Sequence, residues 1–175
     1  MIDPSRNHFE LFGLPMTFRI DADALDAAYR ALQSQVHPDR YAGASDAQRR
    51  LALQSSAQVN EAYRTLKDPV ERARYLLAMR GVDAFDETDT RLPLEFLEAQ
   101  LERRERAADA AAIEDIAALD AILGEVRAEV GTRQQTLAVL LDDPGATRQA
   151  TAGVRELRFL AKVAEDVDAM IAGLD

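Results

Sequence analysis

Apolar residues recur at helical spacing along most of the chain, and this pattern predicts an all-α fold. The expected helices lie at about 7–13, 22–36, 46–67 and 70–80, and then at about 93–108, 112–141 and 147–174. The last of them repeats small and apolar residues at steps of three and four from Ala150 to Leu174. Such a repeat is typical of a seam that packs along partner helices.

The ends of these helices are marked by capping and breaking residues. Asp21 is a good N-cap, Ser45 and Gln48 form a capping box, and Asp68 precedes a proline at the first helical position. The helix after Asp21 has to end at about Val36, because the residue before a proline is pushed out of helical geometry.

The chain is expected to contain two parts joined by a short linker. Residues 83–92 are acidic and polar and have no helical stripe, so they separate residues 1–82 from a bundle at 93–175. Within the bundle, the turn at Asp142-Asp143-Pro144-Gly145 joins two long helices into an antiparallel hairpin that the shorter helix covers. The seam residues that can be assigned are Ala, Val, Leu and Ile.

Charge is distributed unevenly between these two parts. Residues 1–82 carry 11 basic and 10 acidic side chains, whereas residues 83–175 carry 10 and 21. An acidic half repels phosphate, so nucleic acid is not expected as a partner.

Composition also excludes several classes of protein. No apolar run approaches the ~18–20 residues of a membrane span, and polar residues 1–5 do not resemble a signal peptide, so we expect a cytoplasmic protein without a membrane partner. Without cysteine there is no disulfide or thiolate metal site. Two histidines leave little for any other metal site, and we expect no metal, no cofactor and no catalytic residue.

His37-Pro38-Asp39 is the tripeptide with the clearest chemical meaning. It follows an amphipathic helix of about 15 residues and precedes one of about 22. Pro38 stops the first helix and places His37 and Asp39 in the loop between the two. This order resembles the J domain, the domain that stimulates ATP hydrolysis by DnaK-type heat-shock chaperones.

The resemblance extends over most of the chain. Residues 8–15 and 59–66 look like the corresponding segments of the HscB family, co-chaperones of iron–sulfur cluster assembly. Further matches are Pro69, Arg72-Ala73, Tyr75-Leu76-Leu77, Phe96-Leu97, Gln100-Leu101-Glu102, Arg104-Glu105 and Leu157-Arg158-Phe159-Leu160. The resemblance implies a J domain followed by a client-binding three-helix bundle, and a protein that is not itself an enzyme.

The resemblance also implies a chaperone-binding surface around the tripeptide. Its residues here are His37, Pro38, Asp39, Arg30, Gln33 and Arg40. J domains usually dock through a basic face on the helix before the tripeptide, but this helix has only Arg30 beside Asp21, Asp23 and Asp26. Modest electrostatic steering and a transient complex are therefore expected, with Arg30 either a contact or a solvated charge.

A second implied surface, on the bundle, holds the iron–sulfur scaffold protein. Its residues here are Leu97, Glu98, Leu101, Glu102, Glu105 and Phe159. The family often has an apolar residue where this chain has Glu98, which narrows the apolar patch. Two questions stay open. Either Leu97 and Leu101 are core residues, or Phe96 and Ala99 form the buried side of this helix. Phe159 is either exposed or covered by another helix of the bundle.

Four functions are compatible with these patterns. The first is a co-chaperone that delivers a cluster scaffold protein to a dedicated DnaK-type chaperone. The second is a J-domain protein for general unfolded clients, although the usual Gly/Phe-rich or Cys-rich modules are absent. The third is an all-α enzyme, which would need polar groups at the seam. The fourth is a helical adaptor in which the tripeptide is only a turn.

Overall fold

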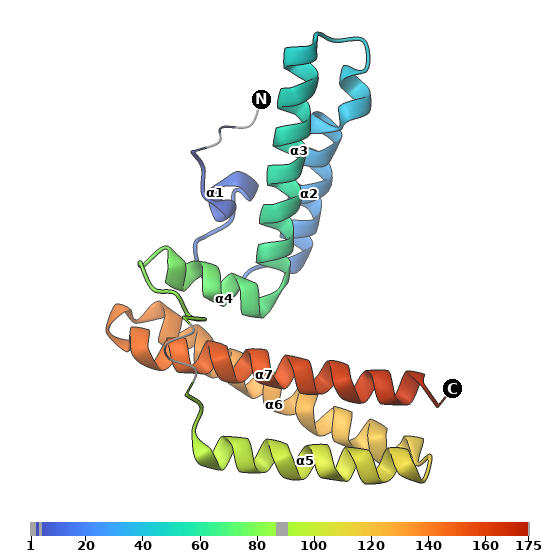
Figure 1. Cartoon of the computed structure of the whole chain (residues 1–175). Helices are drawn as coiled ribbons and strands as arrows, with labels where there is room; N and C mark the ends of the chain where they lie inside the picture. The colour runs from blue at the N-terminus through green and yellow to red at the C-terminus, as the bar shows by residue number, and fades with distance from the viewer. Residues whose placement is uncertain (1–2, 4, 87–90, 175) are drawn as a thin grey trace. The chain divides into compact units, whose positions relative to one another are not determined.

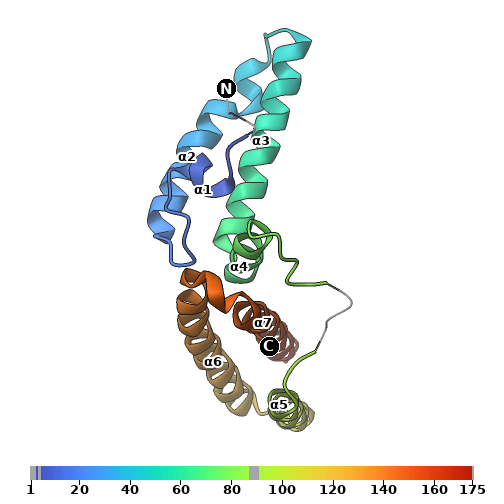
Figure 2. The same cartoon turned by 90° about the vertical axis from the view of Figure 1, so that its left-hand side faces the viewer.

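The computed structural model describes residues 3, 5–86 and 91–174, and in these residues every regular element is a helix. The prediction of an all-α fold is therefore confirmed. The chain divides into two compact units, residues 1–79 and 80–175 (Figures 1 and 2). The sequence had placed this division within the segment 83–92, of which residues 87–90 lie outside the described part.

The first unit is built around two long helices that run antiparallel, side by side (Figure 1). Its elements are α1 (His8–Phe12), α2 (Ala22–Val36), the 3₁₀ turn η1 (Pro38–Tyr41), α3 (Asp46–Lys67) and α4 (Pro69–Ala78). The bounds of α2 and α3 agree with those expected from the sequence.

Capping side chains explain why these helices begin where they do. The Asp21 carboxylate accepts hydrogen bonds from two backbone N–H groups in the first turn of α2, and Asp68 does the same for α4. Ser45 and Gln48 form a complete capping box at the start of α3. These caps therefore fix the first residues of α2, α3 and α4.

Side chains from α2 and α3 lock the two helices together along one edge. The rings of Tyr29 and Tyr63 stack with their centroids 4.0 Å apart. One turn along, Asp26 accepts hydrogen bonds from Tyr63 Oη at 3.0 Å and from Lys67 Nζ at 2.7 Å. The hydrogen bond from Lys67 lowers the pKa of Asp26. The core beneath this edge is apolar and includes Phe9, Leu25, Val59, Ala62, Leu66 and Leu77.

The second unit is a three-helix bundle. Its elements are α5 (Leu94–Ala112), α6 (Ile116–Asp142), the 3₁₀ turn η2 (Pro144–Ala146) and α7 (Thr147–Ala172). The expected break between the first two helices was wrong by about a turn, because the alanine run at the end of α5 continues the helix. The turn falls instead at Glu114, which has a positive φ of 56°, and Asp115 caps α6.

α6 and α7 pack as an antiparallel hairpin with an apolar seam. The buried apolar residues are Leu119, Ile122, Leu123, Val126, Leu137, Ala138 and Leu141 on α6 and Ala150, Val154, Leu157, Leu160, Val163 and Val167 on α7, and Glu156 of α7 is buried with them. Ala84, which precedes α5 in the sequence, packs against the same unit, because it is buried and its carbonyl accepts a hydrogen bond from Arg155 Nε at 2.8 Å.

Candidate partner-binding surfaces

A local hydrogen bond orders the His37–Asp39 loop. α2 ends at Val36, His37 leaves helical geometry with ψ 128°, and the backbone of Pro38 begins η1. His37 Nδ1 accepts the backbone N–H of Asp39 at 3.3 Å. The side chains of His37 and Asp39 are 55% and 89% exposed. The loop therefore displays an imidazole and a carboxylate to solvent at one end of the α2–α3 hairpin.

Two side chains from η1 brace this loop against the end of α2. Arg40 Nη1 donates to the carbonyl of Ser34 at 2.9 Å, and Tyr41 Oη donates to that of Gln35 at 3.2 Å. The last carbonyls of a helix have no partner within the helix, so these bonds satisfy them. Arg40, expected from the resemblance to contact a partner, thus also supports the loop.

Three of the expected chaperone-binding residues line one hollow of about 470 Å³ between α2 and α3: Arg30, Gln33 and His37. Sequence reasoning did not assign the other lining residues, Tyr29, Ser56 and Asn60. Asn60 Oδ1 accepts hydrogen bonds from Tyr29 Oη at 3.0 Å and from the Gln33 amide, which fixes Gln33 in place. The spacing of Ser56 and Asn60, one turn apart on α3, was the available signal.

The charge of this surface differs from what α2 alone suggested. Asp26 pairs with Lys67 of α3, at Nζ–Oδ1 2.7 Å, and this cation compensates its negative charge. Arg30 is exposed. The face around the hollow is therefore less acidic than the α2 sequence implies, although its positive charge is still sparse.

On the bundle, the expected client-binding residues of α5 are exposed. Leu97 and Leu101 are 38% and 59% exposed, and the carboxylates Glu98, Glu102 and Glu105 are also exposed. The buried side of α5 starts with Phe96 as expected, but Ala99 is exposed and Gln100 is buried in its place. The reading of Leu97 and Leu101 as core is therefore wrong.

Ion pairs show which edge of the bundle Leu97 occupies. Each helical residue turns by about 100°, so Arg104 and Arg106 lie about 80° to either side of the inward-facing Phe96. Arg104 is 4.0 Å from Asp166 of α7, and Arg106 pairs with Glu125 of α6 at 2.8 Å. Leu97, about 100° from Phe96 on the Arg104 side, therefore lies at the edge of α5 next to α7.

Phe159 lies at the same α5–α7 edge and is half-buried, which is between the two alternatives that the sequence left open. It is two turns before Asp166 on one stripe of α7. Its ring meets Phe96 edge-on with centroids 5.6 Å apart, so α5 covers part of it. The rest borders an apolar hollow of about 310 Å³ whose lining includes Phe85, Leu92 and Arg158.

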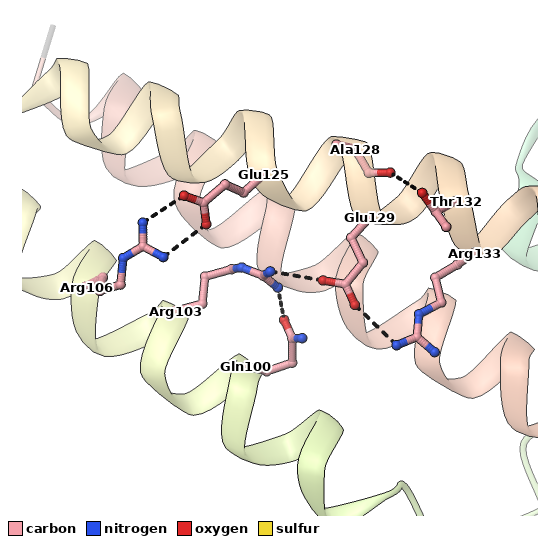
Figure 3. A network of polar contacts seen from close by, with 8 residues as sticks. All are labelled: Gln100, Arg103, Arg106, Glu125, Ala128, Glu129, Thr132 and Arg133. Carbon is pink, nitrogen blue, oxygen red and sulfur yellow. Dashed lines mark hydrogen bonds and ion pairs between the residues drawn. The ribbon is translucent and has the colours of Figure 1, made fainter.

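The seam between α5 and the hairpin is not purely apolar, contrary to the sequence-based assignment. Gln100 and Arg103 of α5 point toward Glu129 and Arg133 of α6 (Figure 3). Periodicity could not reveal this, because a charged residue on an amphipathic helix is by default a surface residue. Among the described residues there is no group of three or more side chains suited to hold a metal ion, and none of their helices is long and apolar enough to cross a membrane.

Comparison with known protein families matches both units. A family model described as a DnaJ domain matches residues 7–75, and one described as an HSCB C-terminal oligomerisation domain matches residues 92–168. A protein from Burkholderia multivorans described as "Co-chaperone protein HscB homolog" is 50% identical over 175 residues, 100% of this chain and 99% of the relative.

Solved structures agree with these sequence matches. Chaperone HscB from Vibrio cholerae is 37% identical with a TM-score of 0.86, over 97% of this chain and 100% of the other. The human co-chaperone protein HscB is 28% identical with a TM-score of 0.87, over 96% of this chain and 83% of the other.

Proposed function

This chain belongs to the HscB family of co-chaperones, and from that premise we propose that it brings a DnaK-type chaperone and an iron–sulfur cluster scaffold protein together. The first unit stimulates ATP hydrolysis by the chaperone, and the second delivers the scaffold protein to it, assisting cluster maturation and transfer. The chain acts in the cytoplasm and is not itself an enzyme, because the hydrolysis takes place on the partner.

The observation that carries this proposal is the exposed, braced loop at His37–Asp39, in a chain whose first unit matches the DnaJ-domain model and whose second matches the HSCB C-terminal model. Because the backbone N–H of Asp39 contacts His37 Nδ1, Nε2 is the ring nitrogen of His37 that is left for a partner. The Asp39 carboxylate can accept two parallel hydrogen bonds from an arginine. Arg30, Gln33 and Arg40 complete the contact, with Pro38 fixing the loop.

A co-chaperone of this kind acts by differential binding. A ligand shifts a conformational equilibrium only as far as it prefers one state over the other. The loop therefore has to bind the hydrolysis-competent state of the chaperone more tightly than the resting state. With sparse positive charge around the hollow, most of this preference comes from the directional contacts of His37 and Asp39 rather than from long-range attraction.

The proposed client surface rests on exposed apolar side chains, whereas the His37–Asp39 loop exposes polar ones. Leu97 lies at the α5–α7 edge that Phe159 also borders, Leu101 is exposed one turn further along α5, and Glu98, Glu102 and Glu105 are exposed beside them. Exposed leucines that converge with an aromatic ring are typical of a protein interface. The carboxylates fit hydrogen-bond donors at the rim of the scaffold protein.

Single-turnover ATP hydrolysis by the partner chaperone tests the first contact. We expect the variants His37→Gln and Asp39→Asn to abolish stimulation while the unfolding curve stays that of the wild type. Asp23→Asn is the matched control, since it removes the same charge from the other end of α2, where Asp23 is exposed. Stimulation retained in both loop variants would favour the adaptor, in which the tripeptide is only a turn.

Client identity separates the first two readings of the sequence. Titration with the folded scaffold protein and, separately, with a permanently unfolded polypeptide should show saturable binding to the scaffold alone. Tighter binding to the unfolded polypeptide would identify a general J-domain protein instead.

A further inference from the structure

α5 is attached to the rest of the bundle with little apolar packing. It buries Phe96, Gln100, Ala107 and Ala110, of which only Phe96 is a large apolar side chain. Gln100, at 1% exposed, occupies a position where a helix of a bundle ordinarily carries leucine. Alanine methyl groups fit against a neighbouring helix at several positions, so they do little to choose one alignment.

Between Phe96 and Ala107 in the sequence, α5 carries Gln100 and Arg103, which form a polar network with α6 (Figure 3). Arg103, with its side chain 13% exposed, donates from Nη1 to the Gln100 amide oxygen and from Nη2 to Glu129 Oε2 at 3.0 Å. Glu129 in turn accepts from Arg133 Nη2 at 3.3 Å. Arg133 also donates to Glu156 of α7, so the chain of contacts joins all three helices.

The same network contacts the aromatic end of α5. The guanidinium of Arg133 lies over the ring of Phe96, 5.1 Å from its centroid. Phe96 meets Phe159 at the edge where Leu97 is exposed. The position of the leucines on the surface is thus coupled, through Phe96 and Arg103, to how α5 sits on α6.

Stability alone does not account for these polar residues. Gln100 Nε2 and Arg103 Nε are both buried without a hydrogen-bond partner. Buried polar atoms left unpaired are unfavourable, and replacing a buried ionic group by apolar side chains of similar size is often neutral or stabilising. What such a group can supply is a single alignment, as a polar residue does at a core position of a coiled coil.

We propose that Gln100 and Arg103 are positioning residues, which fix the register and rotation of α5 on α6 and so place Leu97 and Leu101 for the scaffold protein. This inference rests on the client surface proposed above. It predicts an uncommon combination: apolar replacements that leave the bundle as stable as before, yet weaken its binding of the client.

The double variant Gln100→Leu with Arg103→Met tests this in the full-length chain. It removes only the two side chains that α5 contributes to the polar network, because Glu129, Arg133 and Glu156 retain their contacts with one another. Arg106→Met is the matched control. It removes the same charge from α5 and a two-bond pair with Glu125, but that pair is exposed and therefore contributes little.

Three measurements are made on each protein: the unfolding temperature, the affinity for the purified scaffold protein, and the distance between spin labels at Ala99 of α5 and Val139 of α6. Both label positions are exposed, and the chain has no native cysteine to interfere with labelling. For the double variant we expect an unchanged or higher unfolding temperature, a broadened distance distribution, and binding at least tenfold weaker. The control should match the wild type in all three.

Unchanged affinity in the double variant would overturn the proposal, and so would a distance distribution as narrow as that of the wild type. Loss of cooperative unfolding would overturn it as well, because the network would then be needed for the fold rather than for alignment. The surface variant Leu97→Ala with Leu101→Ala separates this failure from failure of the proposed function. If it binds the scaffold like the wild type, the client surface itself is wrong and the positioning role falls with it.

Discussion

The two units place polar and apolar side chains in opposite ways. In the first unit an apolar core supports an exposed polar loop, where His37 and Asp39 meet solvent. In the second, α5 turns Gln100 and Arg103 inward and displays Leu97 and Leu101 outward. Directional polar contacts suit a transient partner whose conformation has to be sensed, whereas apolar anchors suit a client that has to be held.

This contrast can be tested by the free energy of unfolding, because the first unit has an optical signal that the second lacks. All four tyrosines lie in residues 1–79 and the chain has no tryptophan, so tyrosine fluorescence reports the first unit. Far-ultraviolet circular dichroism reports both. A substitution in the second unit should change the dichroism transition and leave the fluorescence transition in place.

The largest expected decrease in the free energy of unfolding is that caused by Glu129→Leu in the second unit. Glu129 accepts hydrogen bonds from both Arg103 and Arg133, and its removal leaves Arg103 buried without an acidic partner. We expect the second unit to lose about 2–3 kcal/mol, below the full value for a buried pair because the Arg133 side chain is 33% exposed. Unfolding in urea checks this. A loss under about 0.5 kcal/mol would mean that these charges are effectively solvated.

That prediction concerns the part of the fold that the sequence revealed least. The ends of α2 and α3 followed from Asp21, Pro38 and Ser45, because caps and breakers act within a few residues. The His37–Asp39 loop could be placed for the same reason. The positions of Gln100 and Phe159 could not, since each depends on partners from another helix, and periodicity alone does not report contacts between helices.

The α5–α6 turn and the Gln33–Asn60 contact were missed for related reasons. The alanine run that ends α5 contains no breaker, so nothing local marks Glu114 as the residue that takes a left-handed conformation. Asn60 and Gln33 are 27 residues apart in the sequence. Their hydrogen bond depends on the register of the hairpin, which only the packed helices determine.

The next largest effect should distinguish Phe159 from the leucines beside it. Phe159→Ala is expected to lower the stability of the second unit by about 1–2 kcal/mol, because the ring is partly buried and meets Phe96 edge-on. Leu97→Ala with Leu101→Ala should change stability by no more than about 0.5 kcal/mol, yet weaken scaffold binding more than tenfold. Equal stability losses in the two variants would place the leucines in the core.

A smaller change in stability is expected when the pH is lowered, and it should be confined to the first unit. Burial lowers the pKa of His8, whose ring stacks on Tyr75, against a smaller opposing effect of Glu61. The unfolded chain then binds a proton to His8 more readily than the native chain does. The free energy of unfolding is therefore at its full value above about pH 6.5, the pKa of an unperturbed histidine, and decreases as the pH falls below it. Both histidines, His8 and His37, belong to this unit.

Tyrosine fluorescence melts at about pH 7.5 and about pH 5.5 check this expectation. The wild type should unfold at a lower temperature at the lower pH, and His8→Phe, which keeps a stacked ring but cannot titrate, should lose that difference. If His8→Phe shifts as much as the wild type, some other group is responsible.

The smallest effect on stability should come from removing the hydrogen bonds by which Arg40 and Tyr41 support the His37–Asp39 loop. These variants also test whether Arg40 only supports the loop or contacts the chaperone as well. Arg40→Met and Tyr41→Phe each remove one hydrogen bond to the end of α2. These bonds are exposed, so each loss should be about 0.5 kcal/mol or less. If Arg40 also contacts the chaperone, Arg40→Met should reduce stimulation of ATP hydrolysis severalfold, whereas Tyr41→Phe, which changes no charge, should leave it nearly intact. Equal reductions would show that bracing alone matters, and the polar contact in the first unit would then be limited to His37, Asp39 and the residues of the hollow.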